Sequence, residues 1–365
     1  MGSHLDLLFV LGRPLAPLYA GLMRLRAWLY RRGWWRREKM RVPVISVGNL
    51  TLGGTGKTPL VLYLARLLKD VGGRPAVLSR GYGRPRRRGG DRHQPLVVAD
   101  GRQLLQGPEA AGDEPVLLAR SLPGVPVLVG VRRAASGRYA VERLGADSLI
   151  LDDGFQHLAL DRDLDLALFS ARNLPLRVRV FPGGPLREPW SALGRADAVV
   201  ITGVTPESLP EVAAFQRFLK VRWPQLPCFT GEYRPVCLLV GGFDAAMALD
   251  QGKGQPLYGF AGIAQPQSFR QTLLRVGYRL NGFRAFADHH HYTAADYRGL
   301  VQAARQQSAA ALITTEKDLV KLAPLTDDFP LLALRVSLFM EEAFDRFIRL
   351  RLSIPHQVAL PPDGV

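Results

Sequence analysis

One stretch of the chain has the residue types and spacing needed to hold the phosphates of a nucleotide. After an apolar run at 44–47, the sequence from Gly48 to Thr58 reads GNLTLGGTGKT and continues into a helical pattern. Glycines let the backbone fold around phosphates with its N–H groups pointing inward, and the following helix adds its positive N-terminal end. Strand, glycine-rich turn, Gly-Lys-Thr and helix in this order predict a P-loop. Its nucleotide-binding residues are Thr51, Leu52, Gly53, Gly54, Thr55, Gly56, Lys57 and Thr58.

The same motif predicts ATP and Mg²⁺ as cofactors. Lys57 is expected to reach the β- and γ-phosphates as a catalytic residue, and the Thr58 hydroxyl to bind magnesium. The usual motif begins with glycine, whereas this position holds Thr51. Asp152 and Asp153 follow the apolar run 149–151, where P-loop enzymes hold magnesium directly or through water.

Short apolar runs that alternate with helical stretches must position these residues. Strands are expected at 44–47, 76–79, 127–129, 149–151, 166–169 and 198–202, and again at 236–240, 257–261, 311–315 and 331–336. Helices are expected at 60–69 and 134–144. This alternation predicts parallel sheets covered on both faces. The predicted fold class is α/β, with two α/β/α domains, mainly parallel sheets and a P-loop NTPase core.

The segment before residue 42 differs from the rest. Leu18, Leu22, Leu25 and Leu29 recur at helical spacing, tryptophans lie close by, and eight basic residues between 24 and 41 face a single acid, Glu38. This composition favours an amphipathic helix in an anionic membrane interface, and the alternative is a terminal helix packed on the protein's own core. We therefore expect a membrane-interface helix at 1–41, a P-loop core at 42–220, a second α/β domain at 221–352 and a flexible tail at 353–365. The Arg-rich stretch 84–92 is expected to be a surface loop.

Bulk composition limits the partners and the compartment. The 365 residues carry a net charge of +16, which attracts anionic lipid, nucleic acid or a phosphorylated substrate without choosing among them. Two cysteines, Cys228 and Cys237, are too few for a disulfide framework or a cysteine zinc site. No stretch reaches the roughly 20 apolar residues of a spanning helix. The catalytic body is expected to stay in the cytoplasm.

Several further motifs complete a family pattern. They are Ser79–Gly83 (SRGYG), Gly112–Pro115 (GDEP), Asp152–His157 (DDGFQH), Phe181–Glu188 (FPGGPLRE) and Asp288-His289. With the P-loop and its Thr51, they resemble the tetraacyldisaccharide 4′-kinase family in order from about residue 43 to 318. The resemblance implies ATP-dependent phosphorylation of the 4′ hydroxyl of an acylated disaccharide 1-phosphate, which gives lipid IVA in lipid A biosynthesis. It implies a peripheral enzyme on the cytoplasmic face of the inner membrane, and we expect a monomer with no nucleic-acid partner.

The resemblance also assigns roles to residues that composition and spacing leave open. It makes Asp113 and His289 the catalytic pair that receives the hydroxyl proton. Because the two residues lie in different predicted domains, we expect domain closure to bring them together. Glu114 joins Asp152 and Asp153 as a magnesium candidate with hard oxygen ligands. Arg80, Arg133 and Arg187 are candidates for phosphate on ATP or substrate, or are solvated surface residues. Glu188 is expected beside Arg187 as its ion-pair partner.

Other functions share part of this evidence. A P-loop GTPase is one alternative, because Thr315-Glu316-Lys317-Asp318 follows a predicted strand as a guanine-reading motif does, although its lysine comes one position late. A nucleic-acid-stimulated ATPase is a second alternative, motivated by the charge, but no recognition-helix or zinc-finger signature is present. A membrane-associated ATPase without a small-molecule acceptor is a third.

Overall fold

The computed structural model describes residues 9–81, 94–175, 178–322 and 329–353. The predicted loop at 84–92 and the predicted tail, apart from residue 353, lie outside the described residues. The strands are β1 (Val44–Asn49), β2 (Pro75–Ser79), β3 (Leu96–Asp100), β4 (Pro126–Val129), β5 (Ser148–Asp152), β6 (Leu164–Ser170), β7 (Ala198–Thr202), β8 (Cys228–Val240), β9 (Ala246–Met247), β10 (Pro256–Ala261), β11 (Arg279–Ala285), β12 (Ala311–Thr315) and β13 (Leu331–Met340). The α-helices are α2 (Ala16–Arg31), α3 (Lys57–Asp70), α4 (Pro108–Ala111), α5 (Asp113–Ser121), α6 (Arg133–Leu144), α7 (Leu209–Arg222), α8 (Pro266–Val276), α9 (Ala294–Gln306), α10 (Glu316–Leu322) and α11 (Glu342–Arg351).

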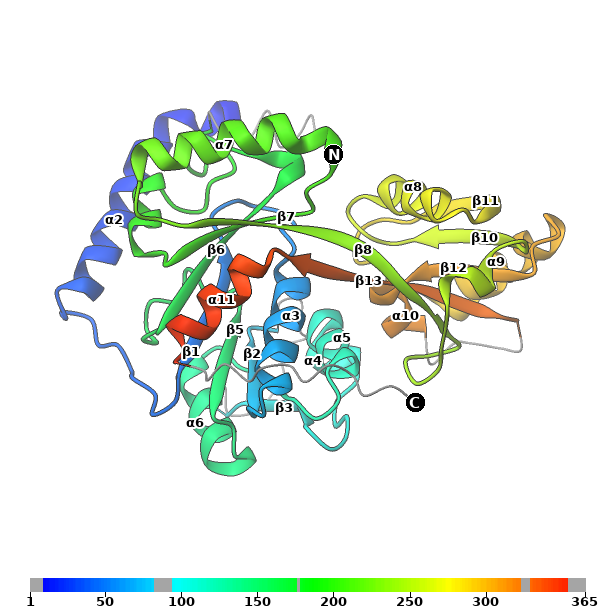
Figure 1. Ribbon diagram of the computed structural model, residues 1–365, viewed down its shortest axis with the longest axis horizontal. Helices are drawn as coiled ribbons and strands as arrows, with labels where there is room; N and C mark the ends of the chain where they lie inside the picture. Colours follow the sequence, from blue (N-terminus) through cyan, green and yellow to red (C-terminus); the bar gives the residue numbers. More distant parts are fainter. Residues whose placement is uncertain (1–8, 82–93, 176–177, 323–328, 354–365) are drawn as a thin grey trace.

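All the described strands belong to one 13-stranded, mainly parallel sheet, which confirms the predicted α/β class. Its order is β11-β10-β12-β13-β8-β7-β6-β1-β5-β2-β4-β3, with β9 beside β8. The sheet forms two lobes joined by the long strands β8 and β13 (Figure 1). The two predicted domains therefore share hydrogen-bonded strands. Their predicted bounds stay a prediction, and α11, at the end of the second range, packs through Phe344 and Ile348 into the core of the first lobe.

The first lobe has three layers because its buried strands alternate their side chains between two apolar faces. Ile45 and Ile150 point toward the face covered by α3, α5 and α11. Leu149 points toward the opposite face, which α6 covers, and Phe169 faces α7 farther along it. The parallel register between β1 and β5 puts Val47 beside Asp152, so the P-loop and the carboxylates leave the same edge of the sheet.

The carboxyl ends of the two lobes' strands face each other. Thr202, at the end of β7, pairs with Gly231 of β8, and Gly231 also pairs with Met340 at the end of β13. Strands β10 and β12 run parallel to β13, so the loops that follow them point toward the first lobe. Helix α10 packs against α5 across this boundary. Residues from both lobes can therefore form one site.

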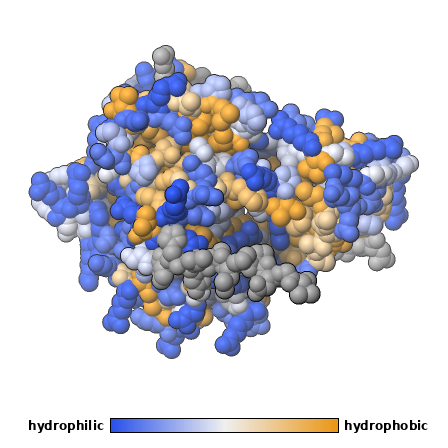
Figure 2. All heavy atoms as spheres, in the orientation of Figure 1, coloured by the Kyte–Doolittle hydropathy of each residue, from blue (hydrophilic) through white to orange (hydrophobic). Residues whose placement is uncertain are grey.

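Helix α2 buries a narrow face and leaves three of its four leucines in solvent. Ala16 and Ala20 are buried, whereas Leu18, Leu22 and Leu25 are 65%, 52% and 51% exposed. In Figure 2 apolar atoms are visible at the upper left, where Figure 1 places α2 and α7. Among the described residues, no helix combines the length and the hydropathy needed to cross a bilayer.

Candidate active site

The P-loop is held open by a network that begins at the end of β1. The Asn49 side-chain amide donates to the carbonyls of Thr51 (2.7 Å) and Gly53 (3.3 Å). The Leu52 amide donates to the Pro185 carbonyl (2.7 Å), and the Arg187 amide donates to the Leu50 carbonyl (2.6 Å). The segment 181–188 therefore holds the start of the loop in place.

The loop's inner amides are left for a ligand. Within the described residues, no backbone carbonyl accepts from the amides of Gly53, Gly54, Thr55 or Gly56. Gly56 has φ +77° and lies just before α3, whose N-terminal end faces the loop. The Thr202 hydroxyl donates to the Thr55 carbonyl (2.8 Å). Free amides and a helix N-terminus together form an anion site.

Charged groups surround the mouth of the loop. Lys57 Nζ lies 3.6 Å from Asp153 Oδ1 and 3.4 Å from Asn49 Oδ1. Arg187 Nη1 donates to both Asp153 oxygens, at 3.0 and 3.1 Å. Burial opposes ionisation of Asp153, but Lys57 and Arg187 outweigh it and lower the pKa of this carboxyl. Asp153 is therefore an anion that holds two cations near the loop.

Asp152 has the chemistry of a magnesium ligand. Its Oδ1 is buried without a hydrogen-bond partner among the described residues, and Ser79 donates to Oδ2 (3.1 Å). Burial, with a smaller contribution from the nearby Glu114, raises the pKa of Asp152 to about 6. In the described part of the chain, no group of three histidine, cysteine or acidic residues could hold a metal by itself. Magnesium is commonly held by one or two carboxylates plus phosphate oxygens, so the residues fit a metal that arrives with ATP.

The second lobe contributes a histidine. His289 Nδ1 lies 3.4 Å from Asp113 Oδ2, and Asp113 is the first residue of α5. His289 has φ +58°, and its amide donates to the Gly262 carbonyl (3.2 Å). His290 faces a different carboxylate, Asp296, at 3.3 Å. The structure thus joins the predicted pair across the two lobes.

Comparisons with known proteins agree with this arrangement. Residues 8–353 match the family model described as tetraacyldisaccharide-1-P 4′-kinase. The chain is 45% identical to the tetraacyldisaccharide 4′-kinase of Desulfotalea psychrophila, covering 94% of this chain and 96% of that protein. It is 44% identical to the tetraacyldisaccharide 4′-kinase of Syntrophus aciditrophicus, covering 82% and 81%. The crystal structure of LpxK from Aquifex aeolicus in complex with ATP superimposes with a TM-score of 0.74 at 33% identity, over 93% of this chain and 98% of that one.

The chain belongs to the tetraacyldisaccharide-1-P 4′-kinase family. The predicted family, fold class and kinase activity are thereby confirmed. Membership in a kinase family leaves the GTPase and ATPase alternatives without support.

The arginines predicted to bind phosphate in this family member have different environments. Arg80 is exposed, while Arg133 is only 2% exposed and donates to the Gly130 carbonyl (3.1 Å). Burial lowers the pKa of Arg133 to about 10, and the charge of Arg80 acts in the same direction. Arg133 Nε has no partner among the described residues. A phosphate would supply the acceptor that this buried donor lacks.

The predicted pairing of Glu188 with Arg187 is wrong. Arg187 binds Asp153, whereas Glu188 accepts from Arg195 through both oxygens, at 2.8 and 3.0 Å. The side chains of these two consecutive residues thus reach different partners. Arg195 also donates to the Phe155 carbonyl (2.9 Å) and lies 4.0 Å from the centre of that ring. Glu188 is 2% exposed, which puts it in the support beneath the site.

Sequence reasoning assigned no role to Asn49, Ser79 and Arg195. Asn49 and Ser79 fall inside the quoted family motifs, so their positions beside the loop and the carboxylates carried a usable signal. Arg195 falls outside them, and its role depends on a long-range contact that local pattern does not reveal.

Proposed function

We propose that this kinase transfers the γ-phosphoryl group of Mg·ATP to the 4′ hydroxyl of a tetraacyldisaccharide 1-phosphate, with Asp113 and His289 receiving the proton. The observation that supports this assignment of roles is the 3.4 Å contact between these two residues, which lie on different lobes. The acceptor oxygen bonds to phosphorus, the bond to the β-phosphate oxygen breaks, and the hydroxyl proton passes to the pair.

The P-loop and the charged residues around it would bind the phosphates and the metal. The amides from Gly53 to Gly56 bind phosphate oxygens, and Lys57 and Arg187 neutralise charge that develops on the transferred group. Thr58, Asp152, Asp153 and Glu114 would hold Mg²⁺ directly or through water, and the metal would supply charge neutralisation on the phosphates. Arg80 and Arg133 would bind a phosphate of the nucleotide or of the acceptor, because the planar guanidinium group suits phosphate.

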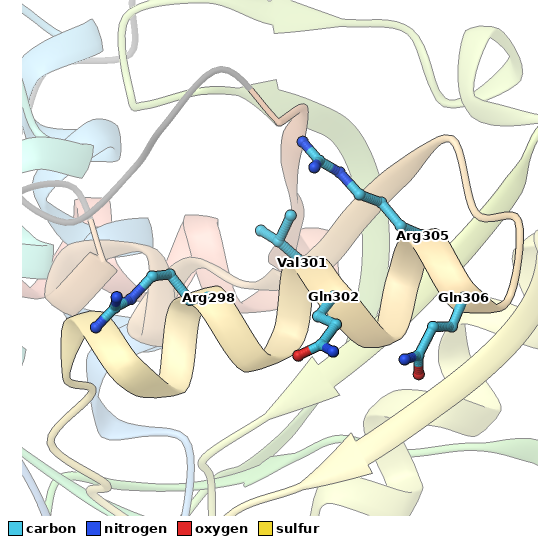
Figure 3. Close-up of a pocket in the computed structure, with 5 residues that line it drawn as sticks. All are labelled: Arg298, Val301, Gln302, Arg305 and Gln306. Carbon is cyan, nitrogen blue, oxygen red and sulfur yellow. The ribbon is translucent and has the colours of Figure 1, made fainter.

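A cleft on the other side of the P-loop strand suits the base of ATP. It has a volume of about 630 Å³ and lies between Gly203 and Thr205, after β7, and Gln265 and Pro266, at the start of α8. In the sheet, β5 with its carboxylates flanks β1 on one side, and β6 and β7 extend on the other. Phosphates on the P-loop would therefore have metal ligands on one side and this cleft on the other. A second groove, of about 300 Å³, is lined by five side chains of α9 alone, none of them among the predicted site residues (Figure 3).

The first test is direct. Purified protein with ATP, Mg²⁺ and detergent-dispersed tetraacyldisaccharide 1-phosphate should give a bisphosphorylated product, and Lys57→Ala should nearly abolish it. Asp113→Ala and His289→Ala should each lower kcat by roughly 10²–10⁴. Full activity in both variants would overturn the proton-acceptor assignment and leave the kinase reaction standing. A strong GTP preference, DNA-stimulated hydrolysis or rapid lipid-free hydrolysis would instead favour one of the alternatives.

We further propose a peripheral position on the cytoplasmic face of the inner membrane, with the protein acting as a monomer. The exposed leucines of α2 support contact with a lipid surface. Leu18→Glu with Leu22→Glu should abolish sedimentation with vesicles that contain anionic lipid, since both side chains face solvent. The matched control is Val221→Glu on α7, where the side chain is 82% exposed but no leucine stripe surrounds it. Equal loss of vesicle binding in the control would argue for a charge effect alone.

A further inference from the structure

Tyr233 lies on the part of β8 that passes from one lobe to the other. Gly231 is the last residue of β8 that pairs with β7, and from residue 232 to 237 the strand pairs only with β13 within the described chain. Figure 1 shows β8 and β13 crossing between the lobes. A side chain on this stretch that reaches the P-loop therefore connects the link between the lobes to the phosphate site.

Two glycines leave room for this tyrosine beside the P-loop. A Cβ at Gly56 would lie 1.9 Å from Tyr233 Oη, and a Cβ at Gly203 would lie 2.9 Å from its Cε2. Both glycines have positive φ, of +77° and +69°. The Tyr233 hydroxyl therefore fills the space next to the residue that precedes Lys57.

We propose that Tyr233 is a positioning residue that, through Thr202, holds the Thr55–Gly56 peptide of the P-loop in the orientation that binds phosphate. The proposal rests on the proposed binding of ATP phosphates by the P-loop amides. It gives Tyr233 no contact with ATP or the acceptor, only an action through the threonine and the peptide. It extends the phosphate site to a strand that lies outside the P-loop motif.

The direction of the hydrogen bonds follows from the groups involved. The Thr202 hydroxyl has one proton, and its neighbours at 2.8 and 3.5 Å are the carbonyls of Thr55 and Phe169, which can only accept. Thr202 also shares a hydrogen bond with the Tyr233 side chain, so the tyrosine is the donor there. Burial raises the pKa of the Tyr233 hydroxyl, which keeps this donor protonated at neutral pH. A chain of hydrogen bonds thus runs from Tyr233 through Thr202 to the Thr55 carbonyl.

This chain fixes the direction of one phosphate-binding amide. The peptide bond between Thr55 and Gly56 is trans, so its C=O and its N–H point in opposite directions. A hydrogen bond from the buried Thr202 to the carbonyl therefore directs the Gly56 N–H to the other side. That amide has no backbone acceptor among the described residues. Without the chain, other orientations of the peptide would be open, and ATP binding would have to restore this one.

Nucleotide affinity measures the effect. Isothermal titration calorimetry should show a Kd for Mg·ATP that is about 3–10-fold higher in Tyr233→Phe, the range expected for the loss of one hydrogen bond. The Kd for AMP should change less than about twofold, because AMP lacks the β- and γ-phosphates that a P-loop holds. The KM for ATP should rise with its Kd, whereas kcat at saturating ATP and the KM for the acceptor should stay unchanged. A loss of general stability would not separate ATP from AMP in this way.

The matched control is Tyr278→Phe. The Tyr278 hydroxyl donates to the Leu249 carbonyl (3.0 Å) within the second lobe, so this variant also loses one tyrosine hydrogen bond. Its affinities for ATP and AMP should both equal those of the unsubstituted protein. Thermal melts of each variant establish that the protein is folded.

A double variant tests whether the two hydroxyls act in one chain. Thr202→Val should raise the Kd for ATP about tenfold, because it removes the hydrogen bond to the Thr55 carbonyl. Thr202→Ser keeps the hydroxyl and should stay within about twofold of the unsubstituted protein. Adding Tyr233→Phe to Thr202→Val should raise the Kd no further, since the chain is already broken, whereas independent effects would multiply.

Three results would each overturn the inference: an unchanged Kd for ATP in Tyr233→Phe, an equal change in the Kd values for ATP and AMP, or multiplied effects in the double variant. Failure of the proposed phosphate site would be seen separately, in Lys57→Ala. If that variant bound ATP as tightly as the unsubstituted protein, the P-loop would not be the phosphate site. If Lys57→Ala lost affinity while Tyr233→Phe kept it, only the role of Tyr233 would fall.

Discussion

Gly56→Ala is the substitution for which the structure gives the sharpest expectation. A Cβ at Gly56 would lie 1.9 Å from Tyr233 Oη and 2.8 Å from Thr202 Oγ1, whereas ordinary contact begins at 3.4 Å. The tyrosine and the loop must therefore separate by about 1.5 Å. The residue also has φ +77°, where a side chain costs about 1–2 kcal/mol. Tyr233 has little room to retreat, since its ring also lies against Gly203.

The affinity for ATP should reveal this strain. The relaxed loop would move its amides away from the positions that bind phosphate, and ATP binding would have to restore those positions. We therefore expect the Kd for ATP to rise at least tenfold, which corresponds to about 1.4 kcal/mol. Isothermal titration calorimetry with Mg·ATP measures it. Gly54→Ala is the matched control, because its Cβ would meet nothing within 4 Å and its φ is not positive.

A double variant separates the two causes. Tyr233→Phe removes the oxygen that the new Cβ would strike, so Gly56→Ala with Tyr233→Phe should regain part of the affinity but not the part lost to backbone strain. Equal ATP affinity in Gly56→Ala and Gly54→Ala would refute the reasoning, because the loop would then not use the geometry on which the phosphate cradle depends.

Two further predictions concern the support beneath the site. Arg195→Met should lower the free energy of unfolding by about 3–5 kcal/mol, because it leaves the buried Glu188 unpaired. Urea denaturation measures this loss, and adding Glu188→Gln should recover most of it. A loss below about 1 kcal/mol in Arg195→Met would contradict the prediction. Burial, followed by the charges of Arg133 and nearby arginines, lowers the pKa of His157 to about 4, so the unfolded chain binds the extra proton between about pH 6.5 and 4. Stability should fall as pH drops through that window, by up to about 3 kcal/mol, and His157→Gln should flatten this part of the stability curve measured by thermal melts.

The buried strands of the first lobe were predictable because they are continuous apolar runs. The runs at 44–47, 76–79, 149–151 and 198–202 all fall in observed strands. The edge strands β3 and β11 were missed, and β11 reads RLNGFRA, with two arginines and an asparagine. An edge strand need not be apolar on both faces, so it gives a weaker signal.

The continuity of the sheet was also missed. Only 236–240 was predicted for β8, but the strand starts at Cys228. Its first residues, CFTGEY, alternate small, polar and aromatic side chains, and they pair with β7 and β13, which lie far apart in the sequence. Such pairing depends on long-range geometry rather than local pattern.

In the site, elementary sheet geometry was sufficient for the P-loop and the carboxylates, since parallel strands end at the same edge. The partnership of Asp113 with His289 came from the family resemblance. Spacing alone could not supply it, because the two residues are on different lobes and only the face-to-face arrangement of the strand ends joins them.

The position of α2 connects the proposed membrane surface to the chemistry. Its Arg26 side chain donates to the Gln156 carbonyl (2.9 Å) and its Tyr19 hydroxyl to the Arg187 carbonyl (3.1 Å). These carbonyls belong to the two segments that carry Asp153 and Arg187, the ion pair at the mouth of the P-loop. The helix whose leucines face outward is therefore tied through its other face to the backbone of the phosphate site. An acceptor embedded in a leaflet beneath α2 would enter from that side, while His289 approaches from the second lobe, so the acceptor and the proton-accepting pair need not compete for the same space.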